Sequence, residues 1–248
     1  MVCLINILLL SDLHLDASPY QIKVSPEIDA VVLAGDISPG THGIRWANQH
    51  FECPVIYVAG NHEYYYQQAG SLIERLKDAA SPHVHVLENE AVSIDGITFL
   101  GCTAWTDFSL AGDQQANMAL ASEQVNDYRF ILNGKEKLCP EHTLSLHQAS
   151  VAWLHQTLLS MQEKPIVVTH HAPAQQSLSE ETDLASTYAS DLSGLISSTG
   201  PLAWLHGHVH TTKIYSVDSV NVYCNARGHH PHHLNTGFDS HFIIRVGQ

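Results

Sequence analysis

The sequence is poor in positive charge. Its 248 residues include 11 Lys and Arg against 25 Asp and Glu, which gives a formal net charge of −14 at pH 7. Proteins that bind nucleic acid through the phosphate backbone need clustered Lys and Arg, and this sequence has no such run. The composition therefore argues against a nucleic-acid polymer as partner. The acidic surplus fits either a highly soluble surface or residues that bind divalent cations.

Paired cysteines are also missing. The five cysteines are widely spaced and odd in number, and no Cys-x-x-Cys pair occurs. Most of them lie in or beside apolar runs, where a free thiol behaves as a small hydrophobic residue. This pattern predicts free thiols in a reducing compartment, so we expect a cytoplasmic protein.

Long apolar runs are absent as well. No run approaches the ~18 apolar residues that a membrane span requires, so we expect no membrane partner. The N-terminal run from Val2 to Leu10 lacks a basic flank and leads into Ser11-Asp12-Leu13-His14 instead of a small-residue cleavage site. It predicts a buried strand, not a signal peptide.

The remaining composition is typical of a globular protein, with 44% hydrophobic and 15% charged residues. The length favours one domain over residues 1–248. Short apolar runs alternate with helical periodicity, which predicts an α/β fold, and Asp95-Gly96 predicts a β-hairpin. We expect strands at 2–10, 28–34, 54–58, 85–87, 91–94, 97–100, 165–169, 202–205, 213–217, 220–224 and 241–246, helices at 41–51, 67–80, 111–130 and 142–161, and a loop with a short helix at 177–199.

Five of the predicted strands run directly into polar residues. Each such junction alone is also typical of a polar turn. In open α/β folds, however, the carboxyl ends of the strands are where sites are built. If the segment after the first strand stays extended, alternate residues there share one face. The five junctions are Asp12-Leu13-His14, Gly35-Asp36, Gly60-Asn61-His62-Glu63, His170-His171 and Gly207-His208-Val209-His210.

Together these junctions indicate a metal site. They offer oxygen and imidazole ligands and no thiol, which suits hard or borderline divalent ions. Their number exceeds what one ion needs. A carboxylate such as Asp36 has two oxygens and can bridge two cations.

The order of the five blocks resembles the calcineurin-like metallophosphoesterase superfamily. The pattern Asp-x-His, Gly-Asp, Gly-Asn-His-Glu, His, Gly-His-x-His spans residues 12–210 in the family's order. The segments 105–108 and 225–228 also resemble stretches of small, uncapped bacterial members, with Ala226 where those carry Pro. The resemblance implies a four-layer αββα sandwich of two mixed β-sheets flanked by helices.

The resemblance also implies a role for each matching residue. Two divalent ions such as manganese, iron or zinc would activate a bridging hydroxide for attack on phosphorus. His62 would not be a ligand but would donate a proton or hydrogen bond to the leaving oxygen. Asp12, His14 and His210 would hold the first ion, Asn61, His170 and His208 the second, and Asp36 would bridge both.

The implied activity is metal-dependent hydrolysis of a small phosphate ester. A phosphodiester such as a cyclic nucleotide is one candidate, and a phosphomonoester or phosphoprotein is the alternative, because the ligand set is the same for both. A non-catalytic metal-binding scaffold is a third reading, although such members tend to lose ligands or the catalytic histidine, and this chain keeps both. A nuclease is disfavoured by the acidic charge.

Two further polar features remain open at this stage. Glu63 either orients a ligand through a hydrogen bond or stabilises its own turn. The histidines at 229–233, interrupted by Pro231, predict a solvated turn in preference to a site for a third ion.

Overall fold

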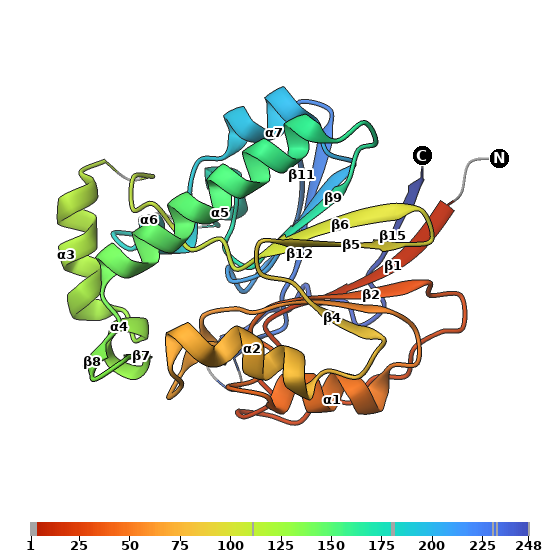
Figure 1. The fold of residues 1–248 in the computed structure, drawn as a ribbon, viewed down its shortest axis with the longest axis horizontal. Coiled ribbons are helices and arrows are strands. Elements are labelled where there is room, and N and C mark those ends of the chain that lie inside the picture. The colour runs from red at the N-terminus through yellow and green to blue at the C-terminus, as the bar shows by residue number, and fades with distance from the viewer. Residues whose placement is uncertain (1–3, 111, 180–181, 230, 232, 248) are drawn as a thin grey trace.

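The computed structural model of the protein describes residues 4–110, 112–179, 182–229, 231 and 233–247. Two mixed β-sheets lie face to face, with helices on the outer side of each (Figure 1). Val2 and Cys3 of the expected first strand, and His230 and His232 of the histidine-rich segment, lie outside the described residues.

The first sheet contains five strands in the order β15-β1-β2-β3-β4. Its four N-terminal strands are parallel, and β15 pairs antiparallel with β1. The parallel strands place their carboxyl ends at one edge, as a binding site requires. The strands are β1 (Leu4–Leu10), β2 (Ala30–Ala34), β3 (Val55–Val58), β4 (Val84–Val86) and β15 (Ile243–Gly247).

The second sheet contains six strands in the order β11-β12-β10-β9-β6-β5. The four inner strands are parallel, and the two edge strands are antiparallel to their neighbours. Asp95 and Gly96 both have positive φ and turn β5 into β6, which confirms the predicted hairpin. The strands are β5 (Glu90–Ile94), β6 (Ile97–Cys102), β9 (Ile166–Thr169), β10 (Ala203–His206), β11 (Thr212–Val217) and β12 (Val220–Asn225).

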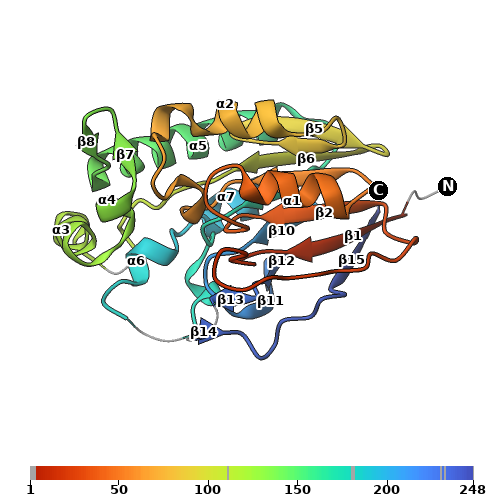
Figure 2. The same ribbon diagram turned by 90° about the horizontal axis from the view of Figure 1, so that it is seen from below.

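Helices cover the outer face of each sheet (Figures 1 and 2). The first sheet packs against α1 (His42–His50) and α2 (Ala69–Ala79), and the second against α5 (Pro140–Ser160) and α7 (Ser193–Thr199). The predicted α/β sandwich of two mixed sheets flanked by helices is confirmed. None of the helices in the described part of the chain has the length and apolarity to cross a bilayer.

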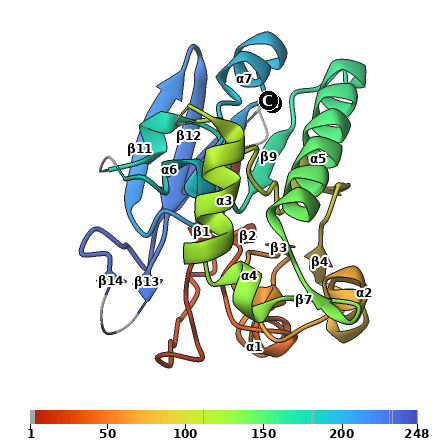
Figure 3. The same ribbon diagram turned by 90° about the vertical axis from the view of Figure 1, so that its left-hand side faces the viewer.

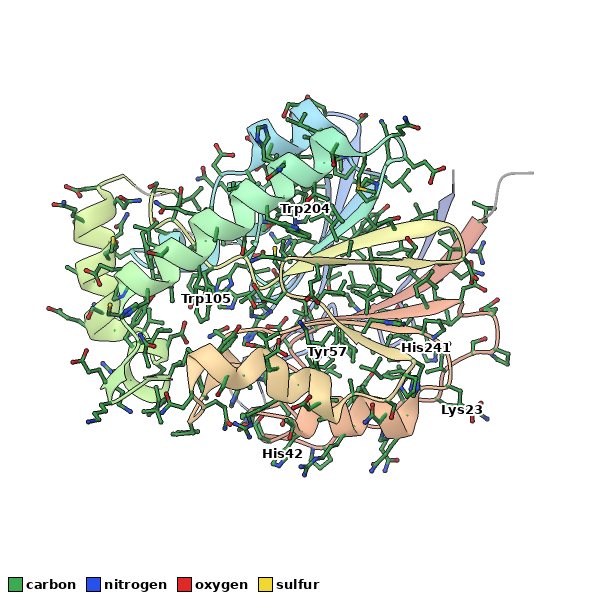
Figure 4. All side chains as sticks on the ribbon, in the orientation of Figure 1. Lys23, His42, Tyr57, Trp105, Trp204 and His241 are labelled. Atoms are coloured by element: carbon green, nitrogen blue, oxygen red, sulfur yellow. The ribbon has the colours of Figure 1, made fainter. Side chains whose placement is uncertain are left out.

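The strands divide their side chains between two sides because successive residues point to opposite faces. Ile7 and Leu9 of β1 pack between the sheets, whereas Leu8 and Leu10 pack toward the helices of the first sheet. Tyr57 lies on the α2 side of the first sheet and Trp204 on the α5 side of the second (Figure 4). Three apolar layers therefore hold the sandwich together.

The predicted helix at 111–130 is two helices, α3 (Gln114–Gln124) and α4 (Asp127–Phe130), and Ala111 itself lies outside the described residues. The Asp113 side chain caps α3 by accepting from the N–H groups of Gln115 and Ala116. Val125 has extended backbone angles and ends that helix, so the chain turns before α4. A small hairpin of β7 (Leu132–Asn133) and β8 (Glu136–Lys137) follows. The segment from α3 to β8, called the excursion below, faces the viewer in Figure 3.

Two other segments are more regular than expected. The predicted loop at 177–199 includes α6 (Ala185–Tyr188) as well as α7, and is preceded by the 3₁₀ turn η2 (Gln175–Ser177). The histidine-rich segment forms a two-stranded ladder of β13 (Gly228–His229) with β14 (His233–Leu234). Pro231, between the two strands, lies in an exposed turn, as the solvated-turn prediction requires.

Candidate metal centre

The five strand ends meet, and the structure brings together all eight residues expected from the sequence. The side chains come from the loops after β1, β2, β3, β9 and β10, so both sheets contribute. Four of them, Asp12, His14, Asp36 and His210, each present one potential ligand atom, all within 4.8 Å of one another. Asp36, His170 and His208 form a second such group.

Asp36 belongs to both groups, and its two oxygens face different partners. Oδ1 lies 3.4 Å from Nε2 of His170, and Oδ2 lies 3.8 Å from Nε2 of His14. Asn61 adds its amide oxygen to the second group, 3.1 Å from His170 Nε2. The arrangement can hold two divalent cations with Asp36 between them.

Backbone strain is concentrated at these residues. Non-glycine residues with positive φ are uncommon, and those at functional sites persist because the surrounding structure holds them. The Asp12-Leu13-His14 segment does not stay extended, because the chain kinks at both ends of the motif. Asp12 N–H and His14 N–H donate to Gly35 O and Asp36 O. The left-handed residues here are Asp12, His14, Asp36, His208 and His210, with φ of 52°, 44°, 56°, 70° and 48°.

Two glycines allow the loops to approach this closely. A Cβ on Gly60 would meet the Asp36 carboxylate, and one on Gly35 would meet the His170 ring. Gly35 also has a φ of +87°, which L side chains rarely adopt. Gly35 is thus needed for both the turn and the space, and Gly60 for the space.

Glu63 holds the Asp36 loop in place. Its buried carboxylate accepts hydrogen bonds from the N–H groups of Asp36 and Ile37, at 2.9 and 2.8 Å, and from Gly60 N–H at 2.8 Å. The hydroxyl of Tyr57 donates to it at 2.7 Å. Glu63 therefore joins the loops after β2 and β3. It stabilises its own turn through Gly60 N–H and also fixes the loop that carries the expected ligand Asp36, so both roles left open by the sequence apply. Burial, offset by these hydrogen bonds, raises the pKa of Glu63 to about 6.

His170 and His208 are oriented by backbone carbonyls. Nδ1 of His170 faces Ala34 O at 2.9 Å, and Nε2 of His208 faces Thr187 O at 3.3 Å. A carbonyl oxygen only accepts, so these nitrogens carry the hydrogens. The other two nitrogens, His170 Nε2 and His208 Nδ1, then present lone pairs to each other across 3.2 Å. Two facing lone pairs repel unless a cation lies between them, so this pair fits a divalent ion.

Burial keeps His14 and His208 neutral and therefore able to bind a cation. Burial lowers the pKa of His14 to about 2, with help from the neighbouring His62, and lowers the pKa of His208 well below its usual value. Burial together with the carboxylates of Asp12 and Glu63 raises the pKa of Asp36 well above its usual value. Divalent cations would offset the buried negative charge.

His62 lies at the mouth of the centre with its side chain 22% exposed. Its backbone N–H donates to Asp36 Oδ1 at 2.9 Å, and its ring stacks on Tyr65 with centroids 4.2 Å apart. Burial, followed by the nearby His170, lowers the pKa of His62 to about 3. A neutral imidazole that faces a cavity can donate a hydrogen bond to a bound ligand.

A cavity of about 840 Å³ opens above the centre. Its lining also includes residues that sequence reasoning did not assign to the site, among them Asp127, Tyr188 and His229. The His229 ring lies 4.9 Å from the His14 ring and 6.2 Å from the His62 ring. Its membership of a histidine-rich segment was the available signal, whereas Asp127 and Tyr188 had none, since they lie far from the motifs in sequence.

Arg227 supports the loop after β1. Its guanidinium donates to Leu13 O and Ser18 O, at 2.9 and 3.1 Å, and lies 5.0 Å from the centre of the Tyr20 ring. The loop that carries Asp12 and His14 is thereby fixed from its outer side. Ala226 forms an isolated bridge with Ser11.

Sequence comparison agrees with this geometry. Residues 5–212 match the calcineurin-like phosphoesterase family (Metallophos), so the chain belongs to that family. The centre is accordingly that of a metal-dependent phosphoesterase. The chain is also 26% identical over 280 residues to the uncharacterized protein L509 of Acanthamoeba polyphaga mimivirus, covering 96% of this chain and 95% of that protein.

Solved structures share the fold. Phosphopantetheinyl hydrolase (PptH) from Mycobacterium tuberculosis superposes with a TM-score of 0.73 at 17% identity, covering 90% of this chain and 89% of that one. A putative 5'-nucleotidase from Staphylococcus aureus gives a TM-score of 0.53 at 13% identity, covering 90% of this chain and 48% of that one. At sequence identities this low, the structural similarity shows a shared fold and nothing further.

Proposed function

We propose that this protein hydrolyses a small phosphodiester with the help of two divalent cations. Asp12, His14 and His210 hold the first cation, Asn61, His170 and His208 hold the second, and Asp36 binds both. The observation that carries this proposal is the position of the Asp36 carboxylate, whose two oxygens face His170 and His14, one from each group of potential ligands.

Two divalent cations held by these residues would supply the Lewis acidity that activates a water, and would offset the negative charge of the phosphoryl group. Buried, neutral imidazoles and the fixed Asp36 carboxylate keep the geometry of the centre rigid, so little reorganisation is needed during the reaction. His62 stands at the cavity side of Asp36 and donates a proton or a hydrogen bond to the leaving oxygen. An anionic substrate beside His62 would raise the pKa of its imidazole toward neutrality.

The composition of the cavity supports a diester over a monoester. Among the described residues that line it, none is Lys or Arg. A monoester carries close to two negative charges near neutral pH, and proteins usually pair that extra charge with cationic side chains. A diester carries one. The lining instead offers apolar groups, including Val125, Leu178 and Leu184, which suit the organic part of a larger ester.

Turnover of paired chromogenic substrates tests this proposal. The Mn²⁺-loaded protein is assayed with bis-p-nitrophenyl phosphate and with p-nitrophenyl phosphate, and the Asp36→Asn variant serves as the blank. The expected result is a higher kcat/KM for the diester. A higher value for the monoester would replace the diester proposal with a phosphatase acting on metabolites or phosphoproteins. Turnover no greater than the blank, with two cations bound, would favour a non-catalytic scaffold.

A second panel narrows the substrate once diester turnover is established. Cyclic nucleotides belong in it as small diesters, and a phosphopantetheinyl conjugate belongs in it because a protein of the same fold is named phosphopantetheinyl hydrolase. The 840 Å³ cavity has room for the organic groups of either. The preferred substrate is the one with the highest kcat/KM above the Asp36→Asn blank.

A further inference from the structure

Asp127 is a buried carboxylate that the proposed chemistry does not use. It begins α4, in the excursion that leaves the sandwich after β6, and its side chain reaches back to the centre. Its Oδ1 accepts a hydrogen bond from Asn61 Nδ2 at 2.8 Å and another from the Tyr65 hydroxyl at 2.9 Å. Asn61 and Asp127 are 66 residues apart in sequence, so the tertiary fold alone creates this contact.

The bond to Asn61 decides which end of the amide faces the cations. An ionised carboxylate only accepts hydrogen bonds, so the amide nitrogen must point to Asp127. The amide oxygen then points the other way and lies 3.1 Å from His170 Nε2. An amide oxygen can bind a cation, whereas an amide NH₂ group cannot. Without the Asp127 carboxylate, the Asn61 amide could rotate and turn its nitrogen toward the site of the second cation.

The bond to Tyr65 acts on a different part of the centre. The Tyr65 ring is stacked on the His62 ring, with centroids 4.2 Å apart and planes 27° apart. Its hydroxyl is fixed by the same Oδ1 that orients Asn61. One carboxylate oxygen therefore fixes both an expected ligand of the second cation and the support on which the His62 imidazole lies.

We propose that Asp127 is a positioning residue that sets the amide orientation of Asn61 and, through Tyr65, the placement of His62. This inference rests on the proposed function, in which Asn61 binds the second cation and His62 assists the leaving group. It adds a residue from the α3–α4 excursion to a centre otherwise built from strand ends.

The surrounding contacts allow this idea to be tested by substitution. The backbone of the α4 segment is held without the Asp127 side chain, since Tyr66 N–H donates to Phe130 O and Leu132 N–H donates to Gln67 O, at 3.0 and 2.9 Å. Asp113 provides a matched control. It lies in the same excursion and also accepts two hydrogen bonds, yet it is not among the residues that line the cavity.

Mn²⁺ binding measured by titration calorimetry is the main readout, with Mn²⁺ alone as the probe. Asp127→Ala is expected to weaken one of the two Mn²⁺ sites by about 10- to 100-fold and to leave the other unchanged. Asp127→Asn keeps an oxygen that can accept both hydrogen bonds, so it should restore most of that affinity. Asp113→Ala should bind Mn²⁺ like the wild type. If the Asp127→Ala variant binds two Mn²⁺ ions with the same affinities as the wild type, the proposal is overturned.

Tyr65→Phe tests the second contact and remains informative if Asp127→Ala does not fold. This variant keeps the stacked ring and loses only the hydroxyl. It should bind two Mn²⁺ ions normally and lower kcat by about 10-fold with an unchanged KM, since His62 is less well placed. An unchanged kcat would overturn the link to His62. Because calorimetry does not depend on turnover, failure of the diester proposal would leave the Mn²⁺ result on Asp127 interpretable.

Discussion

His170 and His208 face each other through Nε2 and Nδ1, 3.2 Å apart, while the opposite nitrogen of each ring faces a backbone carbonyl. Two lone pairs in this position, beside the buried Asp36 carboxylate, make the cation-free centre electrostatically unfavourable. The geometry of the centre therefore favours the cation-bound state over the cation-free state.

Cation binding should consequently stabilise the fold. Adding Mn²⁺ to the chelator-treated protein at about 100 times its dissociation constant should raise the free energy of unfolding by about 2.7 kcal/mol for a single site. The measurement is thermal or urea unfolding across a Mn²⁺ titration. The Asp36→Asn variant is the control and should gain much less. Equal stability of the wild type with chelator and with Mn²⁺ would contradict the metal centre.

Replacing His62 with Ala should separate catalysis from cation binding. The imidazole lines the cavity, and its Nε2 lies 3.9 Å from Asp36 Oδ2. We expect kcat on the preferred ester to fall by ~10²–10⁴-fold. The Mn²⁺ content, measured by elemental analysis, should stay at the wild-type value. A variant that also loses Mn²⁺ would make His62 a ligand.

Glu63→Gln should damage the Asp36 loop. The carboxylate accepts from four backbone N–H groups and a tyrosine hydroxyl, whereas a glutamine side chain has one accepting oxygen and would turn its NH₂ group toward donors. Leaving buried donors unpaired should lower the free energy of unfolding by about 2 kcal/mol or more. Urea unfolding with chelator present measures this loss. The same variant should bind Mn²⁺ more weakly, because Asp36 is less well placed.

A pH effect is expected from Glu88, which accepts hydrogen bonds from the N–H and hydroxyl of Thr103, at 3.0 and 2.6 Å. Burial raises the pKa of its carboxyl from 4.5 to about 6. Below pH 4.5 the group is protonated in both states. Between about pH 4.5 and 6 the unfolded state releases its proton first, so stability falls as pH rises, by about 2 kcal/mol in total.

Glu88→Gln removes this titration and keeps an oxygen for Thr103. The free energy of unfolding of the variant, relative to the wild type, should therefore increase by about 2 kcal/mol between pH 4.5 and 7. Urea unfolding of both proteins with chelator present isolates the contribution of Glu88 from cation binding. Parallel pH curves for the two proteins would contradict the shifted pKa.

The identity of the candidate ligands could be predicted from the sequence because each follows a short buried strand. Apolar runs ending in Gly-Asp, Gly-Asn-His or Gly-His predict polar side chains at the ends of parallel strands, and such ends meet at one edge. The α/β class, the Asp95-Gly96 hairpin and most strand positions follow from the same local patterns. The break between α3 and α4 was missed because helical periodicity continues across Val125.

The tertiary structure decided the features that join distant segments. The left-handed backbone at Asp12 and Asp36 arises from packing of the strand-end loops against each other, and no local propensity requires it. The contacts of Asp127 with Asn61, and of His229 with His14, depend on how an excursion and a C-terminal ladder fold over the centre. Local sequence patterns thus determined which chemical groups are available, because strand periodicity and turns are short-range effects. The orientation of these groups and the shape of the cavity depend on long-range packing, which the local patterns do not encode.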